Sequence, residues 1–222
     1  MGEERRQRAG QIFRSLEETY GTEPWNWHTR QSPFRVLIAT VLSQRTRDEK
    51  TDEAAKALFS TYSSPRRIAN APLEILEEII RPVNYYKTKA KRVKEICRML
   101  VERYSGEVPA TVGELMKLPG VGRKTANCVM IYGFRRSAIA VDTHVHRIAN
   151  RTGIIHTKTP EESERELWKI VPEEYVLFVN EFLVKHGQKI CKPGNPLCYI
   201  CPIIDLCDYE PKNLKSDNSD KE

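Results

Sequence analysis

Apolar residues recur at helical spacing through almost the whole of this 222-residue sequence. The range 4–20 places Ile12 and Leu16 on one face, and the range 33–42 is apolar enough to be buried on most sides. The last long helix is expected over 175–190. No run alternates apolar and polar residues long enough to indicate a strand. The sequence therefore predicts an all-α fold, and its 40% hydrophobic content can fill a core.

Prolines and polar residues mark where several of these helices begin. Thr159 followed by Pro160 is a strong helix start, with an N-cap hydroxyl and proline at the first helical position. Pro65 and Pro72 are each expected to open a short helix. Asp48 follows a polar turn and is the expected cap of the next helix.

A glycine-containing turn, Leu-Pro-Gly-Val-Gly-Arg-Lys-Thr at 118–125, lies between two helical patterns at 111–118 and 125–134. Gly120 and Gly122 allow a sharp turn, with positive φ where needed, and leave no side chain in the way of a ligand. The backbone amides after the second glycine would point outward at the start of a helix, which favours an anion. The pattern predicts a hairpin between two helices, and an ordinary turn without a ligand stays an open alternative.

Two charged residues follow the turn. Lys124 falls in the first turn of the second helix, where the helix dipole disfavours an ammonium group. If it is also partly desolvated, its pKa falls and it becomes an amine nucleophile. Asp142 precedes the helical run 143–149. Taken alone, Lys124 is equally a solvated phosphate contact and Asp142 an N-cap.

The chain is basic, with a net charge of +6 and an isoelectric point near 9, which favours a polyanionic partner. A basic protein without a nucleic-acid role would have the same composition. One basic run lies beside two tyrosines and suits contact with a nucleic acid, although a solvated helix face explains it as well. It consists of Lys87, Lys89, Lys91, Arg92 and Lys94.

Four cysteines lie within one short stretch near the end of the sequence: Cys191, Cys198, Cys201 and Cys207. Structural zinc sites usually have two Cys-x-x-Cys pairs, and this stretch has one. An iron–sulfur cluster accepts uneven spacing, so it is favoured over zinc, which stays open. The two remaining cysteines, at 97 and 128, lie on apolar helical faces and are expected in the core.

Together these features resemble the endonuclease III family of DNA glycosylases, in the same order from about Glu4 to about Cys207. The resemblance rests on the turn at 118–125, on Val-Asp-Thr-His at 141–144, and on the cysteine stretch. It implies that the turn is a helix-hairpin-helix motif and that the four cysteines hold a [4Fe-4S] cluster. The implied catalytic residues are Lys124 and Asp142. The DNA contacts implied in the hairpin are Gly120, Val121, Gly122, Arg123 and Thr125.

The implied activity is that of a bifunctional DNA glycosylase and abasic-site lyase. Such an enzyme acts on double-stranded DNA that contains damaged bases or abasic sites, and it removes oxidised pyrimidines through a lysine Schiff base. It then cuts the strand by β-elimination. The alternatives are a non-enzymatic helix-hairpin-helix binding module and a monofunctional mismatch glycosylase of the same superfamily, including a relative that removes adenine. Lys124 argues against the monofunctional enzymes, because they usually lack a lysine at this position.

The sequence departs from the family where residues fill the space left by the displaced nucleotide. The usual glutamine falls on Arg45, with Gln44 one place before it, and a second position, often leucine, falls on Tyr85. These three are expected to contact DNA. The preference for the opposite base is therefore not inherited from the family. His144 is either a pocket residue or a satisfied histidine at the start of a helix.

The resemblance also implies two helical lobes with DNA bound across the cleft between them. Residues 25–136 would form the lobe with the hairpin, and residues 1–24 plus 137–210 the lobe with the cluster loop. Residues 211–222 contain too few apolar side chains to fold and are expected to be disordered. No run is long enough for a membrane span and no signal peptide opens the chain. A cytoplasmic, prokaryotic monomer without membrane contact, associated with the nucleoid when bound to DNA, is expected.

Overall fold

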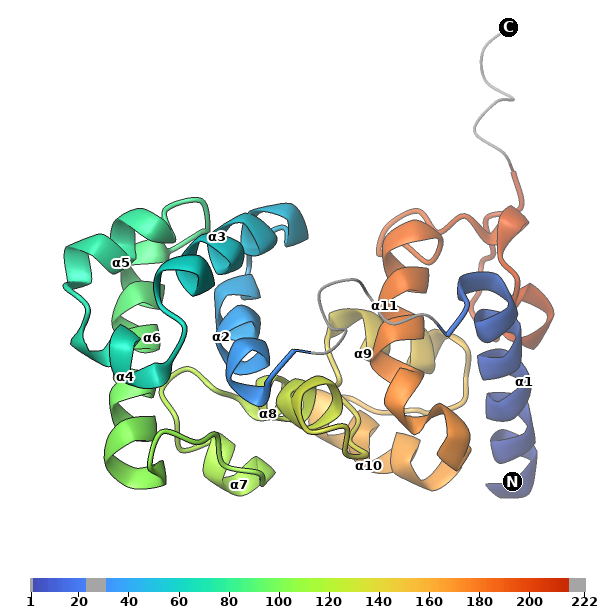
Figure 1. Ribbon diagram of the computed structural model, residues 1–222. Helices are drawn as coiled ribbons and strands as arrows, with labels where there is room; N and C mark the ends of the chain where they lie inside the picture. The colour runs from blue at the N-terminus through green and yellow to red at the C-terminus, as the bar shows by residue number, and fades with distance from the viewer. Residues whose placement is uncertain (1, 23–30, 216–222) are drawn as a thin grey trace, which may run out of the picture. The chain divides into compact units, whose positions relative to one another are not determined.

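The structure is a computed structural model that describes residues 2–22 and 31–215 (Figure 1). These residues form helices and connecting segments without any strand, so the all-α prediction is confirmed. The chain divides into two compact units, one from Met1–Pro24 with Ile139–Glu222 and one from Trp25–Ala138. The first residues of the predicted 25–136 lobe, and residues 216–222 of the predicted disordered tail, lie outside the described residues. No helix within 2–22 and 31–215 combines the length and the apolar character that a bilayer crossing requires.

The unit 25–138 is built around one buried helix, α2 (Pro33–Ser43). Every residue from Val36 to Leu42 is buried, as the apolar run predicts. Ser32 Oγ accepts a hydrogen bond from Arg35 N, and Pro33 occupies the first helical position, so the start of α2 is capped as helix chemistry favours. Around α2 pack α3 (Asp48–Thr61), α6 (Tyr86–Tyr104), α8 (Arg123–Cys128) and the π-helical turn η1 (Val129–Gly133). The smaller helices of this unit are α4 (Pro65–Asn70), α5 (Leu73–Ile79) and α7 (Val112–Leu115).

Three predicted helix starts in this unit need correction. Asp48 is the first residue of α3 rather than its cap; Arg47 takes the cap position and makes no side-chain hydrogen bond there. Pro72 lies at the N-cap of α5 and the helix begins at Leu73. The helix expected over 125–134 begins at Arg123 and changes to π-helical hydrogen bonding at Val129. All three helix boundaries are set by backbone hydrogen bonds at the turns, and side-chain periodicity does not report these bonds.

The second unit contains α1 (Gly2–Tyr20), α9 (Thr143–Arg151), α10 (Pro160–Ile170) and α11 (Val179–Lys189). Helix α11 packs against α1 and α9, and Phe182 is fully buried in this core. The capping box at Thr159 and Glu162 confirms the predicted start of α10. The helix expected over 175–190 is wrong at its beginning, because a 3-10 helix, η2 (Glu173–Phe178), comes before α11.

Candidate functional site

The hairpin at 118–125 is set by its hydrogen bonds and by one glycine. Thr111 Oγ1 caps α7, and Val121 N donates to Leu118 O at 3.1 Å to close the turn. Gly120 has φ +73°, where residues with a side chain are strained, whereas Gly122 has φ −87° and is the N-cap of α8. The predicted positive φ is therefore required at Gly120 alone.

The residues predicted to contact DNA in this hairpin differ in exposure. Gly120, Gly122 and Arg123 are exposed, and Lys124 is half-buried in the first turn of α8. The side chains of Val121 and Thr125 are buried, so these two residues do not present their side chains to a ligand. The amides of Arg123, Lys124 and Thr125 belong to the first turn of α8, where no intrahelical acceptor exists for them, whereas Val121 N is already bonded to Leu118 O.

Gln44, at the end of α2, is tied to this hairpin. Its Nε2 donates to Gly120 O at 2.9 Å and lies 3.5 Å from Thr125 Oγ1. The two neighbouring candidates have left-handed backbones, with φ +54° at Arg45 and +58° at Tyr85. The Tyr85 side chain is 64% exposed. All three line one open hollow of about 420 Å³, together with Thr88, Lys89 and Arg92.

The exposed position predicted for Lys89 was wrong. It was expected on a basic contact surface or a solvated face, but it is only 2% exposed. Its Nζ donates to Leu42 O and Gln44 O, both at 2.6 Å, and to Thr46 Oγ1 at 2.8 Å. Burial, and then the charge of Arg92, lower the pKa of Lys89 to about 8. A signal was present in the sequence, because position 89 precedes Val93 by one turn on the apolar face of α6.

In the other unit Asp142 is the N-cap of α9. Its Oδ1 accepts hydrogen bonds from His144 N and Val145 N, each at 2.9 Å. Within the described residues Oδ2 accepts none. The cap therefore fixes the carboxylate by one oxygen and leaves the other for an outside group.

His144, the second residue of α9, packs against Gly187 of α11. Burial lowers the pKa of His144 below its usual value, and its Nδ1 lies 3.2 Å from Arg147 Nη2. A Cβ added to Gly187 would lie 2.4 Å from this nitrogen, so only glycine fits there. Arg147 Nη2 also donates to Cys191 O at 2.7 Å and thereby joins α9 to the cysteine loop. His144 is therefore packed and has a polar partner, which agrees with the alternative of a satisfied histidine at the start of a helix.

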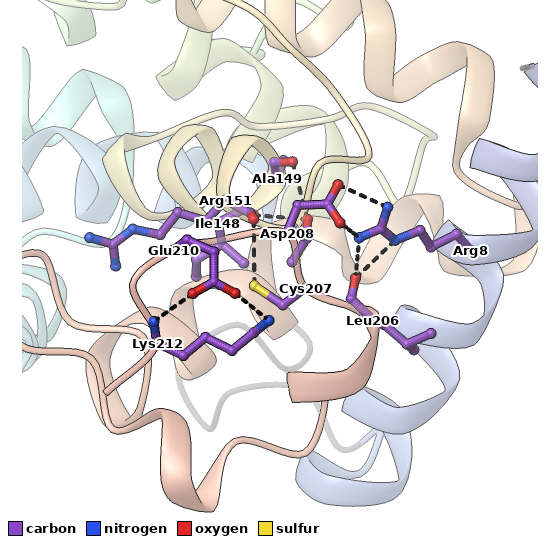
Figure 2. Close-up of polar contacts among 10 residues, drawn as sticks. Arg8, Ile148, Ala149, Arg151, Leu206, Cys207, Asp208, Glu210 and Lys212 are labelled. Atoms are coloured by element: carbon purple, nitrogen blue, oxygen red, sulfur yellow. Dashed lines mark hydrogen bonds and ion pairs between the residues drawn. The ribbon is translucent and has the colours of Figure 1, made fainter. Parts of the chain in front are cut away.

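The four cysteines of the loop line one small cavity together with His186 and Tyr209. Arg151 Nη1 donates to Cys191 Sγ at 3.4 Å, and His186 Nε2 lies 3.6 Å from Cys201 Sγ. Figure 2 shows the end of the loop, where Cys207 Sγ donates to Arg151 O at 3.4 Å. In the same view Arg8 of α1 pairs with Asp208 and donates to Leu206 O, which holds the loop against α1.

The four thiols of this cavity are the protein groups that could hold a metal centre. Within 2–22 and 31–215, no three cysteine, histidine or carboxylate side chains converge as the ligands of one ion would. Four thiols around one cavity are the ligand set that a [4Fe-4S] cluster takes, one thiolate to each iron. Burial raises the pKa of Cys201 to about 11, so a metal has to displace its proton. Cys97 and Cys128, by contrast, are buried in the unit 25–138, as predicted.

Comparison with known proteins gives consistent matches over most of the chain. Residues 38–173 match the family described as HhH-GPD superfamily base excision DNA repair protein. Endonuclease III of Thermotoga maritima is 50% identical over 190 residues, which cover 86% of this chain and 89% of that protein. A trapped endonuclease III–DNA covalent intermediate with an estranged adenine is 39% identical, with a TM-score of 0.80, and the match covers 90% of this chain and 95% of that one. A non-covalent endonuclease III–DNA complex is 37% identical, with a TM-score of 0.84 and coverage of 91% and 94%.

Proposed function

This chain belongs to the endonuclease III family of the HhH-GPD superfamily, and from that premise we propose that Lys124 is its nucleophile and Asp142 the carboxylate that assists it. The chain is a DNA glycosylase and abasic-site lyase of base excision repair. The residue assignment rests on what each unit shows separately: a half-buried lysine in the first turn of α8, and an aspartate whose carboxylate is held by its own helix through one oxygen. An amine nucleophile and a carboxylate that takes up its proton are the groups needed for attack at a sugar carbon.

The substrate is double-stranded DNA with an oxidised pyrimidine or an abasic site, bound by a monomer. A damaged base has to leave the stack before an amine reaches its sugar, so the nucleotide is flipped out. The hairpin amides and the exposed Arg123 bind the phosphates beside the lesion and set the depth of the strand. Arg45 and Tyr85, exposed at the hollow beside Gln44, fill the space that the flipped nucleotide leaves.

The reaction begins when the neutral amine of Lys124 attacks C1′ of the sugar. The ammonium gives its proton to Asp142, and the free Oδ2 is the atom suited to receive it. A C1′–N bond to Lys124 forms while the bond from C1′ to the base breaks, and the base leaves with the electron pair and takes up a proton. Negative charge on Asp142 stabilises the positive charge that develops on the sugar.

The sugar ring then opens and the linkage to Lys124 becomes an iminium ion. The iminium acidifies the C2′ proton, whose removal sends the electron pair toward C3′. The C3′–O bond breaks and the 3′ phosphate leaves, which is the β-elimination that cuts the strand. Water hydrolyses the iminium and returns Lys124 as a free amine.

A [4Fe-4S] cluster on Cys191, Cys198, Cys201 and Cys207 completes the proposal. When bound, it supplies order to the loop rather than a step in base removal. Arg151 and His186 hold the neighbouring sulfur atoms, and the exposed Lys192 is presented toward phosphate. Iron and acid-labile sulfide in the purified protein distinguish this cluster from zinc.

The deciding experiment traps the covalent intermediate. The protein is incubated with a duplex that contains one abasic site, borohydride is added, and protein–DNA adducts are separated by denaturing electrophoresis. We expect an adduct with the wild-type chain and none with Lys124→Gln, which keeps a polar side chain of similar length. An adduct that persists in Lys124→Gln refutes the nucleophile. Tight binding without any wild-type adduct favours a monofunctional glycosylase or a binding module.

A further inference from the structure

We propose that Lys89 is a positioning residue that holds the turns carrying Arg45 and Tyr85 together as one rigid edge of the hollow, facing the base opposite the lesion. This inference rests on the proposed function, because it assigns a task to side chains that contact duplex DNA there. Lys89 itself touches neither substrate nor reacting atoms. It acts through the backbone of the two turns.

The first turn is held at the carboxyl end of α2. The three N–H groups of the Lys89 ammonium meet three acceptors, Leu42 O, Gln44 O and Thr46 Oγ1, at 2.6, 2.6 and 2.8 Å. A positive charge at the end of a helix also complements the helix dipole. An ammonium group has three donors, so its capacity is used completely by this turn.

The second turn is joined to the first through Thr46 and Asn84. Thr46 Oγ1, which accepts from Lys89, also accepts from Asn84 N at 3.2 Å. The Asn84 side chain in turn donates from Nδ2 to Arg45 O at 2.6 Å. Lys89 N donates to Tyr85 O at 3.0 Å, which starts α6 directly after the second turn. The backbone carbonyls of Arg45 and Tyr85 thus both accept hydrogen bonds in this network.

The backbone of both exposed residues shows why such a network is needed. Arg45 and Tyr85 have positive φ, a conformation that large side chains rarely adopt and that persists when surrounding contacts impose it. Glycine would relieve the strain but would present nothing to the DNA. With arginine and tyrosine at these positions, the direction of each side chain depends on the hydrogen bonds that hold the turn.

The residues that line the hollow indicate the function of this hydrogen-bond network. Gln44, Arg45 and Tyr85 line it together with Arg92, whose side chain lies against Gly120, so the two turns border one space. A duplex has a base opposite the lesion to meet these side chains, whereas a single strand has none. The contribution of Lys89 should therefore appear on duplex substrates and not on single strands.

The test compares two substrates for each variant. Single-turnover strand cleavage is measured on an abasic site in a duplex, with guanine or adenine opposite, and on the same oligonucleotide without its complement. The variants are Lys89→Met, which removes all three donors, and Thr46→Val, which keeps the shape of the side chain and removes the oxygen shared by the two turns. Arg98→Met is the matched control, since it removes one exposed cation from the same helix.

We expect Lys89→Met and Thr46→Val to slow duplex cleavage by about tenfold to a hundredfold, the cost of small misplacements in other enzymes, and to change the ratio between guanine and adenine. Both should leave single-strand cleavage close to wild type, and Arg98→Met should alter neither. Equal losses on both substrates would assign Lys89 to the fold alone, and unchanged duplex rates would remove it from positioning. If Lys89→Met does not fold, Thr46→Val decides. A wild-type protein that cleaves no abasic strand refutes the proposed function instead, so the two failures are distinguishable.

Discussion

The two glycines of the hairpin should respond in opposite ways when each is changed to alanine. Gly120 has φ +73°, and an added Cβ would lie 2.9 Å from Arg92 Cδ. A left-handed conformation costs a residue with a side chain about 1–2 kcal/mol, and the flexible end of Arg92 can move aside. Gly122 has an ordinary φ of −87° and no atom within 4 Å of the new Cβ. Gly120→Ala should therefore lose about 1–2 kcal/mol, or about 2–8 °C in melting temperature for a chain of this length. Gly122→Ala should lose less, about 0.5 kcal/mol, because alanine is a poorer N-cap than glycine.

Binding to abasic duplex DNA should rank the two variants differently. Gly122 is exposed at the start of α8, so a methyl group there stands between the amides and a phosphate. Gly122→Ala should bind more weakly than Gly120→Ala although it loses less stability. The assays are urea unfolding followed by circular dichroism and titration with abasic duplex at fixed salt. A loss of stability in Gly122→Ala equal to that in Gly120→Ala would refute the reasoning from φ.

Three further outcomes follow from the site. Asp142→Asn keeps an oxygen for the two cap amides, so it should fold normally yet trap abasic DNA about 10²–10⁴-fold more slowly, whereas Asp142→Ala should also lose about 1 kcal/mol of stability in thermal unfolding. Serine at any one of the four loop cysteines should lower the iron and sulfide content measured after purification, and the loop should become more sensitive to protease. Because the pKa of Lys89 is about 8, raising the pH through 8 converts its ammonium, with three donors, to an amine with two; the ratio of duplex to single-strand cleavage should fall over that range, and a flat ratio would contradict this. Any effect of pH on Lys124 should appear in the single-strand rate as well, so that rate serves as the reference. The other ionisable groups that line the hollow are Arg45, Tyr85 and Arg92.

Side-chain periodicity predicted the fold because it records which face of each helix is buried. The run at 33–42 became the buried helix α2, and Thr159 with Pro160 opened α10 as capping chemistry requires. The position of Lys124 in the first turn of α8 was also readable, since Gly122 ends the turn before it. These features depend on near neighbours in the chain, and a sequence shows near neighbours directly.

The surroundings of Gln44, Arg45 and Lys89 were not readable in this way. Gln44 turns back onto Gly120, 76 positions later in the sequence, while the adjacent Arg45 is exposed. Nothing local distinguishes the two, because a left-handed backbone at arginine or tyrosine runs against their own preferences. Lys89 was assigned to a surface by its charge, although three acceptors from another segment offset the cost of burying it.

The alternatives that the sequence left open at Asp142 are compatible in the structure. An N-cap needs one oxygen of a carboxylate, and proton transfer needs one oxygen as well; Asp142 has two, and the amides of His144 and Val145 both use Oδ1. The cap also fixes the side-chain torsions, so Oδ2 is held in one direction before any substrate binds. The structural role thus supports the catalytic role that we propose for Asp142, and a substitution can separate the two. Asparagine, which keeps the cap and loses the charge, removes the second role while preserving the first.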